Sequence, residues 1–208
     1  MYTMPVPKFF QNDPIFSKID LSVSEQTYVR GKPREYLLYT ARLLATHTDA
    51  KVIVEVGSIR QHMNHTILES NPVCCNDGHS TYFWKEYTSA DIYTVDINPN
   101  SKRIIENDSR LNGVHAITSD AYAFLKSFDK KIDLLFLDAW DVIEGTEYAE
   151  AHLDAYLICK DKLSRRCLIL IDDTDIGNKG KGRAVIPKLF EDGFQLITEG
   201  RQTLLIRE

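Results

Sequence analysis

The stretch IDLLFLD, residues 132–138, is a run of branched apolar residues that ends on a carboxylate. A run this short and this apolar is typical of a strand that is covered on both faces of a parallel sheet. Runs of the same character occupy residues 51–56, 91–97, 114–118 and 166–172. Together they predict a sheet whose strands are mostly buried.

Helical patterns separate these strands. Segment 101–111 follows Asn98 and Pro99, and segment 120–128 begins on Asp120, a residue type that caps helix starts. Apolar residues then recur at helical spacing from Tyr148 to Leu163. Strands that alternate with helices in this way predict an α/β fold with a doubly wound, Rossmann-like, mostly parallel sheet.

Both ends of the chain depart from that alternation. Residues 34–47 read as an amphipathic helix before the first strand, and residues 194–198 and 203–208 read as two strands joined by a tight turn. The sheet should therefore finish on an antiparallel hairpin. We expect a single domain over residues 1–208, with an N-terminal extension and helix over residues 1–48.

The composition restricts the partners. A net charge of -5 and a pI near 5.7 argue against a broad phosphate-binding surface, so we expect a small-molecule partner and no nucleic acid. No apolar run approaches the ~20 residues that span a bilayer, which predicts no membrane contact and a cytoplasmic location. A homo-oligomer is compatible with this composition. His115 lies in a strand pattern and is expected in the core, whereas His152 lies on a helix and is expected to be exposed.

Acidic residues end the predicted strands. In an open parallel sheet the ligand binds outside the carboxyl ends of the strands, so residues at these ends are candidate site residues. An acid in such a place is also a common helix cap, and both interpretations apply to Asp120. The strand-end acids are Glu55, Asp96, Asp120, Asp138, Asp172 and Asp173.

These motifs resemble those of class I S-adenosylmethionine-dependent methyltransferases, in particular the small O-methyltransferases of the catechol and macrocin types. The resemblance covers roughly residues 34–208 and implies the strand order 3-2-1-4-5-7-6. It rests on the order and spacing of the motifs rather than on any single one of them. The matching stretches are EVGS at 55–58, DGHST at 77–81, IYTVDINP at 92–99, ITSDAYAFL at 117–125, DLLFLDAWD at 133–141 and LILIDDTD at 168–175.

The resemblance implies S-adenosylmethionine as the cofactor. Asp96 would accept hydrogen bonds from the ribose hydroxyls, and Asp120 would receive the adenine amino group. Gly57 and Gly78 would allow a close approach of the backbone. The full set of predicted cofactor-binding residues is Glu55, Gly57, Ser58, Gly78, His79, Ser80, Thr81, Asp96, Ile97, Asp120, Ala121, Asp138 and Trp140.

A divalent cation is a second candidate ligand. Asp138, Asp172 and Asp173 end neighbouring strands, and a hard cation such as Mg²⁺ would relieve the repulsion among their carboxylates. In catechol-type relatives the matching positions bind Mg²⁺. The alternative is that Asp138 orients the methionine amino group of the cofactor and that Asp172 or Asp173 caps a turn.

The catalytic residues are less well defined. The catechol-type enzymes carry a lysine base three positions after the first metal ligand, where this sequence has Asp141. Asp138 and Asp141 are therefore the predicted catalytic residues, with Asp141 as a candidate proton acceptor. We expect methyl transfer to a small acceptor, most simply to a hydroxyl group. The alternatives are a binding domain without catalysis and an NAD-dependent oxidoreductase, which the absence of any G-x-G-x-x-G run disfavours.

A long insertion separates Gly57 from Gly78. We expect residues 58–77 to form a lid over the pocket, with Met63 among the apolar residues that pack inward. His62, His65, Cys74 and Cys75 also lie there, but adjacent cysteines are poor joint ligands of one zinc ion, which disfavours a zinc site.

Two basic segments remain open to alternative interpretations. Residues 178–185, NKGKGRAV, fit a flexible loop beside the substrate or a solvated basic loop. Residues 28–36 fit a segment that closes over the cofactor carboxylate or an ordinary helix start.

Overall fold

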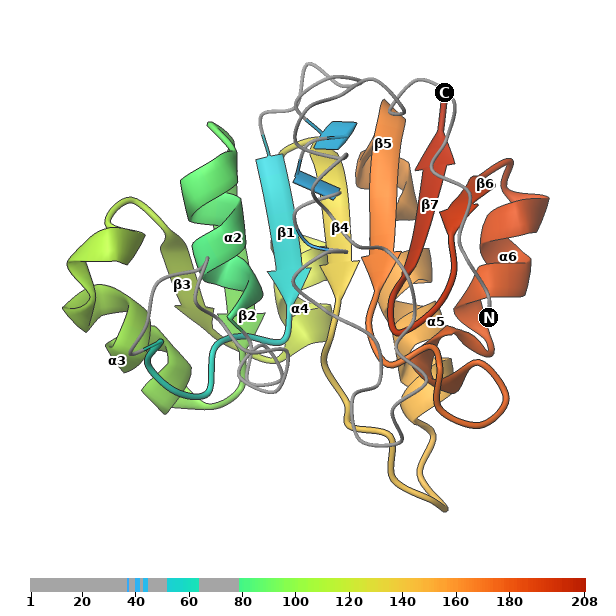
Figure 1. Cartoon of the computed structure of the whole chain (residues 1–208), viewed down its shortest axis with the longest axis horizontal. Helices are drawn as coiled ribbons and strands as arrows, with labels where there is room; N and C mark the ends of the chain where they lie inside the picture. The colour runs from blue at the N-terminus through green and yellow to red at the C-terminus, as the bar shows by residue number, and fades with distance from the viewer. Residues whose placement is uncertain (1–36, 38–39, 42, 45–51, 64–78) are drawn as a thin grey trace.

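The computed structural model of the chain describes residues 37, 40–41, 43–44, 52–63 and 79–208. In this part of the chain one seven-stranded sheet has the order β3-β2-β1-β4-β5-β7-β6 (Figure 1). Only β7 runs antiparallel to its neighbours, β5 and β6, while the other pairs are parallel. These findings confirm the predicted class, strand order and terminal hairpin. The strands are β1 (Val52–Val56), β2 (Asp91–Asp96), β3 (His115–Thr118), β4 (Ile132–Leu137), β5 (Leu163–Ile171), β6 (Gln195–Thr198) and β7 (Thr203–Arg207).

Helices cover both faces of the sheet (Figure 1). One layer contains α2 and α3 together with the described residues of the predicted helix 34–47, which are helical and buried. The other layer contains α4, α5 and α6. No helix in the described ranges is both long and apolar enough to cross a bilayer. The helical elements are α2 (Ser80–Tyr87), α3 (Pro99–Asn107), η5 (Ser109–Leu111), α4 (Ala121–Ser127), α5 (Tyr148–Cys159), η6 (Lys160–Lys162), η7 (Gly180–Gly182) and α6 (Val185–Glu191).

Alternate residues of each central strand enter opposite layers. On β1, Ile53 packs with the α2 layer, whereas Val52 and Val54 pack with the α5 layer. This period of two explains why the strands are apolar throughout, since both of their faces are buried. By the same alternation Glu55 lies on the face of Ile53, and it is fully buried.

Two predicted boundaries were wrong. The helix predicted over 101–111 ends at Asn107, because Asp108 is extended and its side chain accepts a hydrogen bond from Arg110 N, which caps the separate turn η5. The helical spacing up to Leu163 was also misleading, since α5 ends at Cys159 and Leu163 already begins β5. In both places local backbone geometry overrides the apolar period.

The predictions for the two histidines were both wrong, in opposite directions. His152 is fully buried, because α5 packs between α4 and α6 and its ring lies against Trp140. His115 is exposed, because β3 is the edge strand, and its ring stacks on Tyr93 at 4.4 Å. Sequence periodicity does not reveal which strand becomes an edge.

The burial of His152 predicts a dependence of stability on pH. Burial, assisted by the charge of Lys181, lowers the pKa of His152 from 6.5 to about 4. In the unfolded chain His152 therefore binds a proton near pH 6.5, whereas in the folded chain it binds one only near pH 4. Stability from this group is present above pH 6.5 and is lost as the pH falls through this window, by about 3 kcal/mol at 1.36 kcal/mol per pKa unit.

Urea unfolding of the wild type and of His152→Leu, measured from pH 7 to pH 4, tests this expectation. The free energy of unfolding of His152→Leu should fall less between pH 7 and pH 4 than that of the wild type. This difference does not depend on how stable the variant is at pH 7. His115→Leu is the matched control, because the side chain of His115 is exposed. The same pH dependence in wild type and His152→Leu would contradict the expectation.

Candidate functional site

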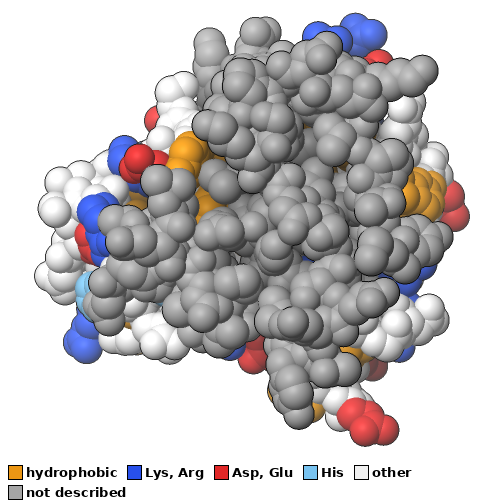
Figure 2. All heavy atoms as spheres, in the orientation of Figure 1, with side chains coloured by type: hydrophobic (Ala, Val, Ile, Leu, Met, Phe, Trp, Pro, Cys, Tyr) orange, Lys and Arg blue, Asp and Glu red, His pale blue; other side chains and the backbone are white. Residues whose placement is uncertain are grey.

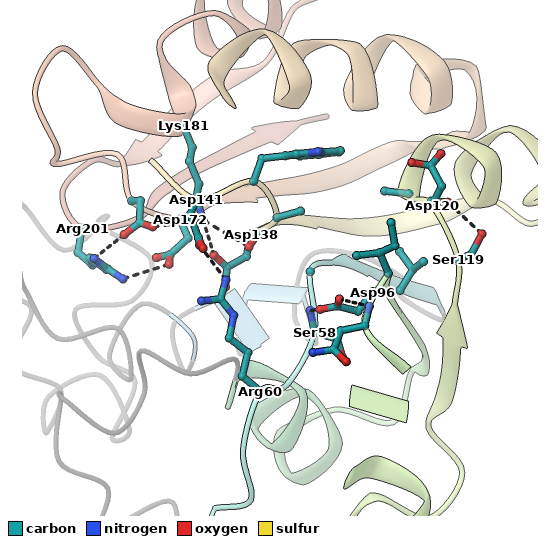
Figure 3. Close-up of a pocket in the computed structure, with 18 residues that line it drawn as sticks. Ser58, Arg60, Asp96, Ser119, Asp120, Asp138, Asp141, Asp172, Lys181 and Arg201 are labelled. Carbon is teal, nitrogen blue, oxygen red and sulfur yellow. Dashed lines mark hydrogen bonds and ion pairs between the residues drawn. The ribbon is translucent and has the colours of Figure 1, made fainter. Parts of the chain in front are cut away.

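A pocket opens at the carboxyl ends of the parallel strands (Figure 3). It contains the acidic residues that end β2, β4 and β5, as the topology of a doubly wound sheet requires. Its lining residues are Gly57, Ser58, Arg60, Val95, Asp96, Ile97, Asn98, Ser119, Asp120, Ala121, Asp138, Ala139, Trp140, Asp141, Asp172, Asp173, Lys181 and Arg201.

Asp96 is held rigidly between the ends of β1 and β2. One carboxylate oxygen accepts a hydrogen bond from Ser58 N at 3.1 Å, and the other accepts one from Asn98 N at 2.8 Å. Figure 3 shows Asp96 beside Ser58 in the lining of the pocket. The neighbouring Ile97 is 77% exposed, so an apolar side chain lies open to a ligand beside a fixed carboxylate.

Asp120 lies at another part of the pocket, with Ser119 and Ala121. Its side chain caps α4 by accepting a hydrogen bond from Ala123 N at 2.9 Å. The cap function that the sequence allowed is therefore present. The predicted contact with an adenine amino group stays a prediction.

Glu55, Ser80 and Thr81 form a buried hydrogen-bonded cluster between β1 and α2. Glu55 accepts hydrogen bonds from Ser80 Oγ, from Thr81 Oγ1 at 2.6 Å and from Trp84 Nε1 at 3.2 Å. Burial raises the pKa of Glu55, and these hydrogen bonds oppose that rise. Glu55, Ser80 and Thr81 do not line the pocket; they bind the first turn of α2 to β1 beneath it.

Gly57, the first glycine of the predicted cofactor motif, allows the ends of β1 and β4 to pack closely. Gly57 has φ +92°, and a Cβ there would lie 2.6 Å from the carbonyl oxygen of Asp138. Only glycine allows β1 to pass the end of β4 this closely. Of the neighbouring predictions, Ser58 lines the pocket, His79 is buried but does not line it, and Gly78 lies outside the described residues.

Three carboxylates meet at the ends of β4 and β5. Oxygen atoms of Asp138, Asp172 and Asp173 lie within 4.8 Å of one another. Burial, and then the charge of Asp138, raises the pKa of Asp172, while Arg201 opposes the rise. Both Asp173 and Trp140 have left-handed backbone conformations, with φ of 52° and 46°, which are rare for side chains of this size and often mark functional sites.

Two basic side chains form ion pairs with this cluster, and sequence reasoning missed both. Lys181 Nζ lies 2.8 Å from Asp138 Oδ1 and 3.2 Å from Asp173 Oδ2, and the lysine is only 1% exposed. Arg201 lies 3.2 Å from Asp172 Oδ2 and 2.5 Å from Asp173 Oδ1. The cluster is thus a network of buried ion pairs rather than a set of bare carboxylates (Figure 3).

This arrangement does not fit the expected magnesium ion. Mg²⁺ requires about six oxygen ligands at ~2.0–2.1 Å. Here an ammonium group, which has no lone pair to offer a metal, contacts two of the three candidate ligands. Lys181 also shows that NKGKGRAV is not a solvated basic loop at this position.

Asp141, the other predicted catalytic residue, forms an ion pair across the pocket. Arg60 Nη2 donates to Asp141 Oδ1 at 2.7 Å, and both side chains are 54% exposed. Arg60 follows β1 and Asp141 follows β4, so the pair joins two strand ends. This contact occupies the carboxylate that the sequence offered as a proton acceptor.

The predicted lid begins with residues that are fixed to the body of the domain. Ile59 and Met63 are buried, and the carbonyl of Met63 accepts a hydrogen bond from Arg110 at 2.6 Å. Met63 therefore packs into the core of the α2 layer, and the lid over the pocket stays a prediction. Residues 64–77 of the insertion, with His65, Cys74 and Cys75, and the segment 28–36 lie outside the described residues.

Comparison with known sequences matches residues 75–174 to a methyltransferase-domain family. Among curated proteins no significant match is found.

Solved structures provide further matches. The S-adenosylhomocysteine-bound methyltransferase PaMTH1 of Podospora anserina is 20% identical, with a TM-score of 0.58, over 84% of this chain and 77% of that one. An O-methyltransferase of Bacillus cereus in complex with S-adenosylhomocysteine is 13% identical, with a TM-score of 0.54, over 92% of this chain and 85% of that one. A proposed rRNA methylase of Clostridium thermocellum is 12% identical, with a TM-score of 0.54, over 81% of this chain and 94% of that one. At these identities the likeness establishes the fold.

Proposed function

We propose that this chain is a class I S-adenosylmethionine-dependent methyltransferase, as its fold and the family match over residues 75–174 support, and that it methylates a hydroxyl group of a small-molecule acceptor. The observation that carries the proposal is a single pocket with two unlike ends. One end has the rigid carboxylate of Asp96 beside an open apolar residue, and the other has a network of buried charges.

The Asp96 end suits the nucleoside of the cofactor. A carboxylate already fixed by Ser58 N and Asn98 N can accept two ribose hydroxyls without reorganising. Ile97 and Ala121 offer apolar contacts to a planar base. In this proposal Asp120 receives the adenine amino group, and Trp140 and Asp138 border the methionine part.

The Asp138 end suits the acceptor. Methyl transfer forms a bond between the acceptor oxygen and the methyl carbon, breaks the bond from that carbon to the sulfonium sulfur, and releases the hydroxyl proton. A group that takes up this proton should titrate near the working pH. Asp172 and Asp141 are the candidates for this task. Burial and the charge of Asp138 raise the pKa of Asp172, but both of its carboxylate oxygens accept hydrogen bonds, from Arg201 and Gln202. Asp141 is more exposed and pairs with Arg60 through one oxygen.

Charge favours a small acceptor over a nucleic acid. The net charge is -5, and on the face seen in Figure 2 basic side chains lie beside acidic ones around the described rim. Nucleic-acid binding relies on a continuous basic surface. The likeness to a proposed rRNA methylase nevertheless makes RNA the acceptor to test alongside metabolites.

Tritium transfer from labelled S-adenosylmethionine tests the proposal, with a metabolite extract and total RNA as separate acceptor pools. We expect label in the metabolite fraction and a loss of at least tenfold with Asp96→Ala. Label in RNA alone would replace the small acceptor by a nucleic acid. Binding of S-adenosylhomocysteine without transfer to either pool would favour a non-catalytic binding domain.

A further inference from the structure

We propose that the acceptor end of the pocket is independent of metal ions, because the Lys181 ammonium takes the place that a divalent cation would hold among Asp138, Asp172 and Asp173. This inference rests on the proposed function, and it identifies Lys181 as the cation at the acceptor end of the pocket. Its geometric basis is the contact of Lys181 Nζ with Asp138 at 2.8 Å and with Asp173 at 3.2 Å.

Lys181 lies in the turn η7, before α6, and two glycines flank it. A Cβ on Gly180 would lie 1.8 Å from the carbonyl oxygen of Asp173, and one on Gly182 would lie 2.4 Å from Ile186 Cδ1. Gly180 also has φ +43°. Gly180 therefore lets the turn η7 press against the backbone that follows β5, while Gly182 packs against the side chain of Ile186 on α6.

Hydrogen bonds of the backbone hold the same turn in place. Gly180 N donates to Ile176 O at 2.7 Å, and Gly182 N donates to Lys179 O at 2.8 Å. The side chain of Lys181 enters the pocket wall from this turn (Figure 3), and its Nζ also contacts the carbonyl of Asp138 at 3.3 Å. The lysine is thus a fixed part of the site and not a surface side chain that happens to reach it.

The charges of the cluster leave little need for a metal. Lys181 and Arg201 face three carboxylates, so one net negative charge remains when all five groups are ionised. A divalent cation would have to displace the ammonium or lie beside it, and like charges in a buried site repel strongly.

The chemical consequence concerns the acceptor oxygen. Burial alone would lower the pKa of Lys181, but Asp138, Asp172 and Asp173 outweigh burial and raise it. Held between the carboxylates of Asp138 and Asp173, the Lys181 ammonium serves as a fixed positive charge toward the oxygen that loses its proton, not as the base.

Binding of Mn²⁺, followed by the loss of its free electron paramagnetic resonance signal, tests the proposal with S-adenosylhomocysteine present. Wild type should show no stoichiometric Mn²⁺ site. Lys181→Met removes the charge but keeps an unbranched side chain, and it should bind one Mn²⁺ per chain at least tenfold more tightly than wild type. Lys181→Met with Asp138→Asn should lose that site again.

Lys179→Met is the matched control, because Lys179 lies two residues away in the same loop and pairs with Glu199 at the surface. It should behave as wild type, and so should Lys181→Arg, which keeps a cation. One tight Mn²⁺ ion in wild type, or no gain in folded Lys181→Met, would overturn the proposal. Calorimetry with S-adenosylhomocysteine on the same samples tests the cofactor pocket separately, so failure of one proposal does not decide the other.

Discussion

Replacing Arg201 by alanine is expected to lower the free energy of unfolding by about 3–5 kcal/mol, the range for removing one partner of a buried ion pair. Arg201 is 5% exposed and contacts Asp172 and Asp173 at 3.2 and 2.5 Å. Without its guanidinium, two carboxylates would remain beside each other with less compensating charge and little access to water. The cost therefore arises from the buried charges left behind.

Urea unfolding at pH 7 measures this loss. Arg183→Ala is the control, because Arg183 and Glu150 form a surface pair whose side chains are 43% and 50% exposed, and such pairs contribute about 1 kcal/mol or less. Adding Asp172→Asn to Arg201→Ala should restore part of the stability, because an amide carries no charge. Equal losses in Arg201→Ala and Arg183→Ala would contradict the importance of the buried network.

Asp96→Ala is expected to weaken the binding of S-adenosylhomocysteine by ~1.5–3 kcal/mol, or roughly 10- to 150-fold, the range for losing hydrogen bonds to a charged group. In the proposed complex this carboxylate accepts the ribose hydroxyls. It is already positioned by Ser58 N and Asn98 N, so the substitution removes a preorganised acceptor. Isothermal titration calorimetry gives the two dissociation constants directly.

Asp91→Ala is the matched control for this measurement. Asp91 begins the same strand that Asp96 ends, and its exposed side chain lies 3.7 Å from Lys130, away from the pocket. Equal affinity of wild type and Asp96→Ala would contradict the ribose assignment, provided that thermal unfolding shows the variant folded. Tight binding of NAD in place of S-adenosylhomocysteine would contradict the choice of cofactor.

The sequence by itself determined the sheet and the place of the pocket. Short apolar runs such as 132–138 can be satisfied only by burial on both faces, and the alternation with helices makes the strands parallel. Parallel strands end at one edge, so Asp96, Asp138 and Asp172 had to meet there, as the lining of the pocket shows. These inferences need only the local pattern and the handedness of the connections.

Only the tertiary structure decided how the charges of the site are paired. Arg201 comes from a turn, but β7 pairs antiparallel with β5 and sets Thr203 opposite Ile171, which brings the turn beside Asp172. Lys181 arrives from a loop whose close approach depends on Gly180, which lies against the carbonyl of Asp173. Glu55 turns toward α2 rather than toward the pocket because β1 alternates its side chains between two buried layers. The contacts of Lys181 with Asp138, of Arg201 with Asp172 and of Glu55 with Thr81 join residues far apart in the chain. No local pattern encodes a partner that only the packing of strands and loops brings within reach.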